Sequence, residues 1–524
     1  MTQPRRISPR TLKEWLRDGG ELALIDVREQ GAFSREHLLY ASNLPLSRLE
    51  PTLANLVPRS GSRLVLCDAG TSDAAQRATA AAAAFGYTDV NLLEGGVAAW
   101  REAGYEVFSG VNVPSKAFGE YVEHRYDTPR ITAQALAALR EAGTNMVILD
   151  SRPMEEYHTV SIPGGIDCPG GELVYRVFDA APDPATLVVV NCAGRTRSII
   201  GAQSLINAGV PNRVVALKDG TMGWQLAGFE AASGRTAHAG PPSPHGLERA
   251  RAAARQVGMR HGVREIDRAE LEHLRIECDS RTLYLFDVRT PEEYVAGHFP
   301  GSRHAPGGQL VQATDEFAAT RHARIVLIDV DGVRATMTAS WLRQLGWDDV
   351  FVLRDALQGE LERGPYRPKL LGFEPVPTVA ARELERMLAR DATVAVVDGG
   401  TSVQYRRRHI PGAIWCMRSR LQQLPQASAY VFTSPNGVYA HYCARDLLQR
   451  SPGASVRVLD GGSGAWFAAG LPHERGEGRM IGAADDVWVK PYQRAQAQAA
   501  MQEYLTWEVN LVEQIARDGD ARFR

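Results

Sequence analysis

Leu187-Val-Val-Val190 is followed by Asn191 and by the run Cys192-Ala-Gly-Arg-Thr-Arg-Ser198, which leads into the apolar-rich segment 199–205. The first run is short, apolar and rich in β-branched residues, which is typical of a strand buried on both faces. Segment 199–205 favours a helix. Cys192 therefore stands at a strand end, in a glycine-containing turn before a helix N-terminus. These features predict an anion-binding loop around a nucleophilic thiol.

The sequence on either side repeats this alternation of strand and helix. Apolar runs at 146–149 and 213–217 predict two further strands. Segments 132–142 and 198–208 predict helices, the first of them capped by Thr132. Alternating strands and helices indicate an α/β fold with a doubly wound, mainly parallel sheet and helices on both faces. Ligands bind such sheets at the carboxyl ends of the strands, where Cys192 falls.

The unit around Cys192 occurs four times along the chain. The copies share Asp-x-Arg pairs, Pro-Gly pairs and Gly-x-x-x-Trp motifs at matching spacings. The matching residues are Asp26, Arg28, Gly96 and Trp100 in the first copy, Asp150, Arg152, Pro163, Gly164, Gly220 and Trp224 in the second, Asp287, Arg289, Pro300 and Gly301 in the third, and Asp398, Pro411, Gly412, Gly462 and Trp466 in the fourth. The repeat predicts four tandem domains of roughly 100 to 115 residues each.

These repeats divide the chain into six segments. The expected segments are a first domain at 1–112, a second domain with Cys192 at 118–235, a linker at 236–260, a third domain at 261–366, a fourth domain at 372–475 and a helical tail at 476–524. The linker begins with a Pro/Gly/Ser-rich stretch. Apolar residues of the tail fall near one face of a helix over 492–517, so the tail packs on its own chain or joins two copies in a homodimer.

The composition excludes several classes of protein. The 524 residues are 44% hydrophobic and 23% charged, and the formal net charge of −2 gives no basic stripe for nucleic acid. No apolar run reaches the ~18 residues that suggest a membrane span, and the N-terminus lacks the apolar stretch of a secretion signal. Six widely spaced cysteines form neither a disulfide framework nor a CxxC metal pair. We expect a cytoplasmic protein that uses no metal and no cofactor.

The ordered motifs resemble those of the rhodanese family of sulfurtransferases. The motifs are Asp-x-Arg, Glu-Tyr, Ile-Pro-Gly, Cys-x-x-x-x-Arg and Gly-Gly-x-x-x-Trp, and they extend over nearly all of the chain before the tail. The resemblance implies rhodanese-like doubly wound domains with parallel five-stranded sheets, and a sulfane sulfur carried as a cysteine persulfide. Many members pair an inactive N-terminal unit with an active C-terminal one, so this chain resembles two such pairs in succession.

Only the second unit keeps the cysteine. At the equivalent position the repeat places Asp68 in the first unit, Asp329 or Val330 in the third and Ser434 in the fourth. None of these residues carries a thiol. We therefore expect no sulfur chemistry from the first, third and fourth units.

Cys192 is the expected catalytic nucleophile of the second unit. Loop amides, a helix N-terminus and nearby cations favour the thiolate, which is the form that attacks sulfur. Arg195 and Arg197 are expected to hold the donor's oxygens through charge-assisted hydrogen bonds. The expected substrate-binding residues are Ala193, Gly194, Arg195, Thr196, Arg197, Ser198 and Arg152. Arg152 also has a structural interpretation, because the Asp150–Arg152 pair recurs in units without the cysteine.

The resemblance implies that Cys192 attacks thiosulfate, releases sulfite and passes its sulfur to cyanide or a thiol. Arg197 completes a Cys-x4-Arg spacing, shorter than the Cys-x5-Arg loop of phosphatases. Two cations in the loop are closer to thiosulfate-type than to mercaptopyruvate-type members. The glycine, however, stands two residues after the cysteine instead of three. Transfer from 3-mercaptopyruvate or from a glutathione or protein persulfide stays open, as does a non-catalytic interaction scaffold.

Overall fold

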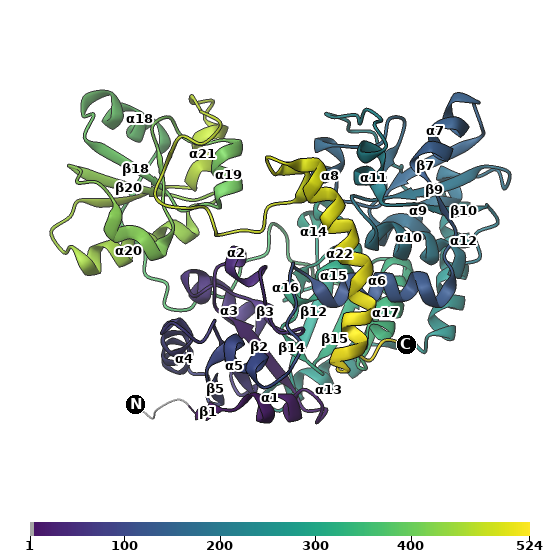
Figure 1. The fold of residues 1–524 in the computed structure, drawn as a ribbon, viewed down its shortest axis with the longest axis horizontal. Helices are drawn as coiled ribbons and strands as arrows, with labels where there is room; N and C mark the ends of the chain where they lie inside the picture. The colour runs from purple at the N-terminus through teal and green to yellow at the C-terminus, as the bar shows by residue number, and fades with distance from the viewer. Residues whose placement is uncertain (1–4) are drawn as a thin grey trace.

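The computed structural model describes residues 5–524, which form four α/β units and a C-terminal helix (Figure 1). Each unit is built on its own mainly parallel sheet. The strand orders are β1-β5-β4-β2 with β3 beside β2 in unit 1, where β14 of unit 3 adds a strand next to β2, β6-β10-β9-β7-β8 in unit 2, β11-β16-β15-β12-β13 in unit 3 and β17-β21-β20-β18-β19-β22 in unit 4. The predicted fold class, four doubly wound domains followed by a helical tail, is confirmed.

Unit 2 carries Cys192 and follows the expected alternation closely. Its elements are β6 (Arg130–Ile131), α7 (Ala133–Glu141), β7 (Met146–Asp150), α8 (Met154–Thr159), β8 (Ile166–Asp167), η2 (Gly170–Glu172), α9 (Leu173–Ala180), β9 (Leu187–Asn191), α10 (Thr196–Asn207), β10 (Val214–Leu217) and α11 (Gly220–Leu226). All of its strand pairs are parallel. Thr132 caps α7 as predicted, since its side chain accepts a hydrogen bond from the Ala135 N–H. Cys192 directly follows the central strand β9.

The other units repeat this plan. Unit 1 contains β1 (Arg5–Ile7), α1 (Pro9–Trp15), β2 (Leu22–Asp26), α2 (Gln30–Phe33), β3 (Ser42–Asn43), η1 (Leu46–Arg48), α3 (Leu49–Leu56), β4 (Leu64–Cys67), α4 (Ala74–Ala84), β5 (Val90–Leu93) and α5 (Gly96–Glu102). Unit 3 contains β11 (Arg264–Ile266), α13 (Arg268–Ile276), η3 (Glu277–Asp279), β12 (Leu283–Asp287), α14 (Pro291–Ala296), β13 (Arg303–His304), α15 (Gly307–Gln312), α16 (Thr314–Phe317), β14 (Thr320–Arg321), β15 (Arg324–Ile328), α17 (Val333–Gln344) and β16 (Val350–Leu353). Unit 4 contains β17 (Thr378–Val379), α18 (Ala381–Arg390), β18 (Val394–Asp398), α19 (Ser402–Arg407), β19 (Ile414–Trp415), η4 (Arg418–Gln423), β20 (Ala429–Thr433), α20 (Val438–Arg450), β21 (Val456–Leu459), α21 (Gly462–Ala468) and β22 (Arg479–Met480).

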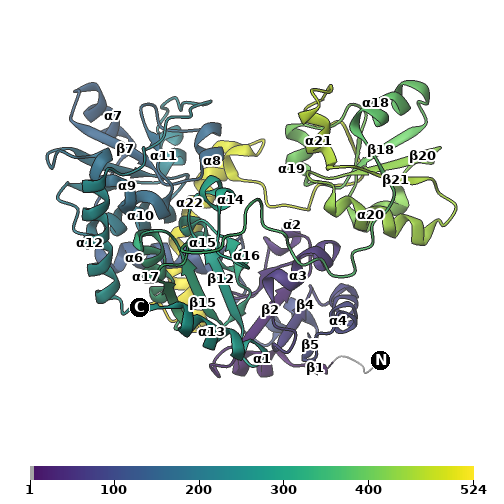
Figure 2. The ribbon, with the colours of Figure 1, turned by 180° about the vertical axis from the view of Figure 1, so that it is seen from behind.

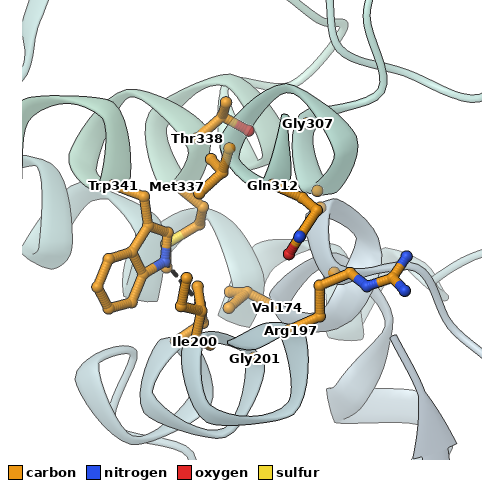
Figure 3. Close-up of a pocket in the computed structure, with 14 residues that line it drawn as sticks. Val174, Arg197, Ile200, Gly201, Gly307, Gln312, Met337, Thr338 and Trp341 are labelled. Atoms are coloured by element: carbon orange, nitrogen blue, oxygen red, sulfur yellow. Dashed lines mark hydrogen bonds between the residues drawn. The ribbon is translucent and has the colours of Figure 1, made fainter. Parts of the chain in front are cut away.

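Units 2 and 3 pack against each other through matching glycine corners. Gly171 of η2 meets Gly308 at the start of α15, where a Cβ on either residue would lie 2.9 Å from the backbone nitrogen of the other. A small apolar cavity lies beside these corners, and across it the Trp341 indole N–H donates to the Ser204 hydroxyl at 2.7 Å (Figure 3). Helix α12 (Pro244–Arg260), which occupies most of the segment expected as a linker, packs against α9 and α17. Two units and this helix thus share one core.

Units 1 and 4 meet at the corresponding corners, η1 and η4. Arg418 forms an ion pair with Glu50 at 2.7 Å, and the Tyr439 hydroxyl donates to the Ser47 carbonyl at 3.0 Å. The pairing is therefore nested, unit 1 with unit 4 and unit 2 with unit 3, and the successive pairing implied by the resemblance is wrong. Unit 3 also joins unit 1, because β14 pairs antiparallel with β2. Figure 2 shows unit 4 beside unit 1, and Arg407 of α19 in unit 4 also forms an ion pair with Glu155 of α8 in unit 2.

The tail folds back over the first three units. Its 3₁₀ turn η5 (Pro491–Gln493) leads into α22 (Ala497–Asp518), which packs along α6 (Val113–Tyr126), the helix between units 1 and 2 (Figure 1). Lys13 of unit 1 pairs with Asp518 at 3.0 Å, and the Arg524 N–H donates to the Gln344 carbonyl of unit 3 at 2.9 Å. The tail thus packs on its own chain, and a contact between two copies stays a prediction.

The glycine corner gives a test of the pairing of units 2 and 3. Gly171→Ala places a methyl group 2.9 Å from the Gly308 nitrogen, and overpacking against backbone should lower the free energy of unfolding by about 1–3 kcal/mol. Gly170→Ala is the matched control, since its nearest contact across the corner would be an ordinary 3.6 Å. Urea unfolding of both variants makes the comparison, and equal stability would contradict the packing described.

Candidate active site

The loop 192–198 encloses the thiol between β9 and α10. The Cys192 side chain is 2% exposed, and its Sγ lies 3.5 Å from the Ser198 hydroxyl oxygen. That hydroxyl donates to the Arg195 carbonyl at 2.8 Å, which fixes its orientation. The Cys192 carbonyl accepts from the Thr221 N–H at 2.8 Å, so the start of α11 holds the loop from behind. The thiol is thus buried in a rigid turn.

Two opposing effects act on the Cys192 thiol. Burial raises its pKa, because a charged thiolate is poorly solvated there. The Arg197 cation and hydrogen bonding to Ser198 lower the pKa, but burial outweighs both, and the Glu508 carboxylate adds to the rise. Burial therefore favours the protonated thiol over the thiolate. The loop nevertheless supplies the groups that stabilise an anion at this position.

Arg197 is the cation that serves the loop. Its guanidinium binds the Glu156 carboxylate at 2.9 and 3.2 Å and the Gln309 amide oxygen of unit 3 at 3.3 Å. Lys490 of the tail lies 3.2 Å from the same carboxylate. Burial alone would raise the pKa of Glu156, but the two cations hold it well below its ordinary range. Because two cations share one carboxylate, this cluster keeps a net positive charge beside Cys192.

Arg195 does not share this role. Its guanidinium binds Glu120 at 2.7 Å through two nitrogens, Glu123, and Asp219 at 3.1 Å. The side chain is 6% exposed. Both glutamates lie on α6, outside the repeated unit. The structure thus brings only one of the two loop arginines to the face where an anion could bind, and it uses the other to anchor the loop to α6.

The remaining expected site residues divide into two groups. Ala193 packs against Met501 and Leu505 of α22, and the Thr196 hydroxyl donates to Glu508 at 3.2 Å. Gly194 faces the same helix, since a Cβ there would lie 3.0 Å from Glu508 Oε2. Arg152, in contrast, is fully buried in its ion pair with Asp150 at 2.7 Å. Arg28 and Arg289 form the matching ion pairs of units 1 and 3, with side chains 10% and 5% exposed. Arg152 supports the loop's surroundings and does not line the cavity described next.

A cavity of about 310 Å³ opens in front of the loop. It is formed by four separate parts of the chain in addition to unit 2. Residues that line it include Ala193 and Arg197 of the loop, Lys116 of α6, Gln309 of α15, and Trp488 and Tyr504 of the tail. At the edge of the neighbouring apolar cavity, the Arg197 guanidinium points away from that cavity (Figure 3). A ligand in the larger cavity would therefore meet cations and aromatic rings.

Sequence reasoning missed Lys116, Gln309, Tyr504 and Glu508 as site residues. Lys116 comes from a segment that carries no motif. Gln309 stands in the run 306–311, which matches 169–174 of unit 2 but does not indicate a contact with the loop of another unit. The sequence could have indicated Glu508, because this residue stands on the apolar face of the tail helix between Leu505 and Leu511, at helical spacing. A carboxylate on a buried face requires a polar partner. That partner is the active loop.

The cysteine-less loops show what the turn binds. The Asp68 carboxylate accepts from the Gly70 and Ala75 N–H groups at 2.7 and 3.2 Å. In unit 3 the residue at the position of Cys192 is Asp329 and not Val330. The Asp329 carboxylate accepts from the Ala335 N–H at 3.0 Å. The Ser434 hydroxyl oxygen of unit 4 accepts from the Ala440 N–H at 3.3 Å. In every unit the amides after the central strand point at one side chain.

The part of the chain from residue 5 onward shows neither a metal-ligand cluster nor a membrane-spanning helix. No group of three or more His, Cys, Asp or Glu side chains in residues 5–524 could hold a metal ion. Among the helices described, none is both long enough and apolar enough to cross a bilayer.

Comparison with known proteins agrees with this geometry. The family model described as "Rhodanese-like domain" matches residues 8–103, 132–227, 267–359 and 380–469. The crystal structure described as "Thiosulfate sulfurtransferase from Pseudomonas aeruginosa" is 47% identical, covers 99% of both chains and superposes with a TM-score of 0.92.

Two curated relatives match only parts of the chain. The Synechocystis protein slr1261, described as uncharacterized, is 33% identical over 108 residues, which are 21% of this chain and 58% of that protein. "Probable adenylyltransferase/sulfurtransferase MoeZ" of Mycobacterium tuberculosis is 36% identical over 96 residues, 18% of this chain and 24% of that protein. The chain thus spans less than two thirds of either relative's length.

Arg197 gives a test of the electrostatics. Because its cation favours the Cys192 thiolate, Arg197→Gln should raise the pKa of Cys192 further and slow its alkylation at a given pH, by roughly tenfold for each pKa unit. The rate of iodoacetamide labelling of the Cys192 peptide, followed by mass spectrometry from pH 7 to 10, measures this shift. Arg101→Gln, at an exposed arginine of unit 1, is the control. An unchanged profile for Arg197→Gln would refute the assignment.

Arg195 gives a test of the anchor. Arg195→Met leaves the buried Glu120 without its cation and leaves Glu123 paired with Arg130 alone, which should cost about 3–5 kcal/mol of stability. Adding Glu120→Gln removes one unpaired charge and should recover part of the loss. Urea unfolding of the single and double variants tests both expectations. A double variant no more stable than the single one would argue against the pairing.

Proposed function

The chain belongs to the rhodanese-like domain family of sulfurtransferases, and from this membership we propose that unit 2 moves sulfane sulfur from thiosulfate to cyanide or a thiol through a persulfide on Cys192. Units 1, 3 and 4 lack a thiol at the equivalent position and act as packing supports. We also propose the domain boundaries that the sequence repeat predicts.

One observation carries the proposal. The turns of units 1 and 3 hold the carboxylates of Asp68 and Asp329 on their backbone N–H groups, at the position that Cys192 occupies in unit 2. The same turn therefore suits an anion attached to residue 192, either a thiolate or a terminal persulfide sulfur. Ser198 offers its backbone N–H, and Arg197 offers its charge. Unit 2 is the unit in which that anion can react.

The first half-reaction loads the sulfur. The Cys192 thiol loses its proton to solvent, and the thiolate attacks the outer sulfur of thiosulfate. The sulfur–sulfur bond of thiosulfate breaks, and sulfite leaves with the electron pair. A persulfide anion then remains on Cys192, stabilised by the loop amides and Arg197. In the second half-reaction cyanide attacks the terminal sulfur, which gives thiocyanate and restores the thiolate.

The cavity favours small donors and acceptors. Its volume of about 310 Å³ and its cations, Arg197, Lys490 and Lys116, suit a small anion. The thiosulfate sulfurtransferase described for Pseudomonas aeruginosa supports thiosulfate as the donor. Transfer from 3-mercaptopyruvate or a glutathione persulfide is compatible with the same cavity. A protein persulfide fits less well, because the tail covers the loop.

Mass spectrometry of the intact protein tests the proposal. Treatment with thiosulfate should add the mass of one sulfur atom, and cyanide should remove it. Cys192→Ser should abolish the added mass. Cys168→Ser is the control and should load normally, because Cys168 is fully buried and burial raises its pKa.

The outcomes separate the alternatives. Loading by 3-mercaptopyruvate or glutathione persulfide, with none by thiosulfate, would replace the donor and keep the mechanism. If no donor loads Cys192, the chain is better described as an interaction scaffold.

A further inference from the structure

Glu508 of α22 packs against the active loop, and one oxygen of its carboxylate has no hydrogen-bond partner. The residue is 2% exposed. Its Oε1 accepts hydrogen bonds from the Thr196 hydroxyl at 3.2 Å and the Tyr504 hydroxyl at 2.9 Å. Its Oε2 has no hydrogen-bond partner and would lie 3.0 Å from a Cβ on Gly194. A buried carboxylate oxygen without a partner is costly, and its position beside a reactive loop points to a role in the chemistry.

Tyr504 connects this carboxylate to the cavity. Its side chain lines the cavity together with Ala193 and Arg197, while its hydroxyl donates to Glu508. A molecule in the cavity therefore reaches the carboxylate through one phenol. The contact does not depend on the repeated unit, because both residues belong to the tail.

Charged and titratable groups surround Glu508 on every side. Lys116 and Glu120 face it from α6, Arg195 and Cys192 from the loop, and Tyr504 from its own helix. Burial raises the pKa of Glu508 to about 7, and Glu120 adds to this rise, against the opposing effects of Lys116, Tyr504 and Arg195. The carboxyl group can therefore take up or release a proton near neutral pH.

We propose that Glu508, acting through the Tyr504 hydroxyl, accepts the proton of a thiol acceptor while that thiol removes sulfur from the Cys192 persulfide. The proposal rests on the proposed function, because it requires the persulfide. It concerns the second half-reaction and thiol acceptors specifically. Cyanide attacks as CN⁻, which forms from HCN in bulk solution, so its attack needs no proton transfer to Tyr504.

The step balances as follows. The acceptor thiol gives its proton to the Tyr504 oxygen as the Tyr504 proton passes to Glu508. The acceptor sulfur attacks the terminal sulfur of the persulfide and forms a new sulfur–sulfur bond. The bond between Cys192 Sγ and that terminal sulfur breaks, and Sγ keeps the electron pair as a thiolate. The products are the acceptor persulfide anion, the Cys192 thiolate and a protonated Glu508.

The test compares two acceptors on protein already loaded with sulfur. Glu508→Gln keeps the shape of the side chain and removes its basicity. Discharge of the persulfide by glutathione should fall by about 10²-fold at pH 7.5, a typical contribution of general base catalysis. Discharge by cyanide should fall far less, so the ratio of the glutathione rate to the cyanide rate is the readout. Glu503→Gln, on the exposed face of the same helix, is the matched control.

The pH profile gives a second readout. In the wild-type protein the glutathione rate should rise as pH increases through about 7, because the base must be deprotonated. Glu508→Gln should lose this rise and keep only the later one that follows ionisation of glutathione itself. Tyr504→Phe should lower the same rate ratio, because it interrupts the connection to the carboxylate.

Thermal unfolding separates this role from a structural one. The raised pKa means that the folded protein prefers protonated Glu508, so this contribution to stability is complete below the ordinary carboxyl pKa and is lost as pH rises through about 7. Glutamine resembles the protonated form, and Glu508→Gln should therefore not lower the melting temperature at pH 8.

The proposal fails if Glu508→Gln slows both acceptors equally, or slows neither. If the wild-type protein does not load at all, the proposed function fails first and this proposal with it. Normal loading and cyanide discharge with an unchanged glutathione rate would overturn the proposal alone.

Discussion

The N–H groups that open the helix after each central strand need an acceptor, because the first turn of a helix cannot satisfy them internally. Each unit places a side chain on those amides. Units 1 and 3 use the carboxylates of Asp68 and Asp329, and unit 4 uses the Ser434 hydroxyl. In unit 2 the side chain at this position is the thiol of Cys192. The anion site is therefore a property of the fold, and residue 192 decides whether it is structural or reactive.

The surroundings of that loop come from outside the repeat. Helix α6 supplies Glu120 and Glu123 to Arg195, and unit 3 supplies Gln309 to Arg197. The tail supplies Glu508 to Thr196. Burial raises the pKa of Cys192 and Glu508 raises it further, so Arg197 is the charge in this set that favours the thiolate. The three cysteine-less units matter because they hold these segments in place.

The sequence alone was sufficient to predict the local structure of each unit. The strand before Cys192, the cap at Thr132 and the replacement of the cysteine by Asp68 could all be read from local patterns and the repeat. Contacts between units could not be read in this way, because the partner of a side chain such as Arg195 lies on another segment and leaves no periodic signal. The nested pairing of units escaped prediction for the same reason, since chain order does not determine which corners meet.

The position of α22 has a consequence for how the protein is made. A ribosome completes α11, the last helix of unit 2, about 270 residues before it reaches Ala497, where the helix that covers the active loop begins. Throughout that interval the nascent chain carries its cysteine turn without the tail's carboxylate, aromatic rings or lysine. The same holds for any chain that ends early. The reactive sulfur is therefore enclosed only after α22 has been made and has packed against the loop.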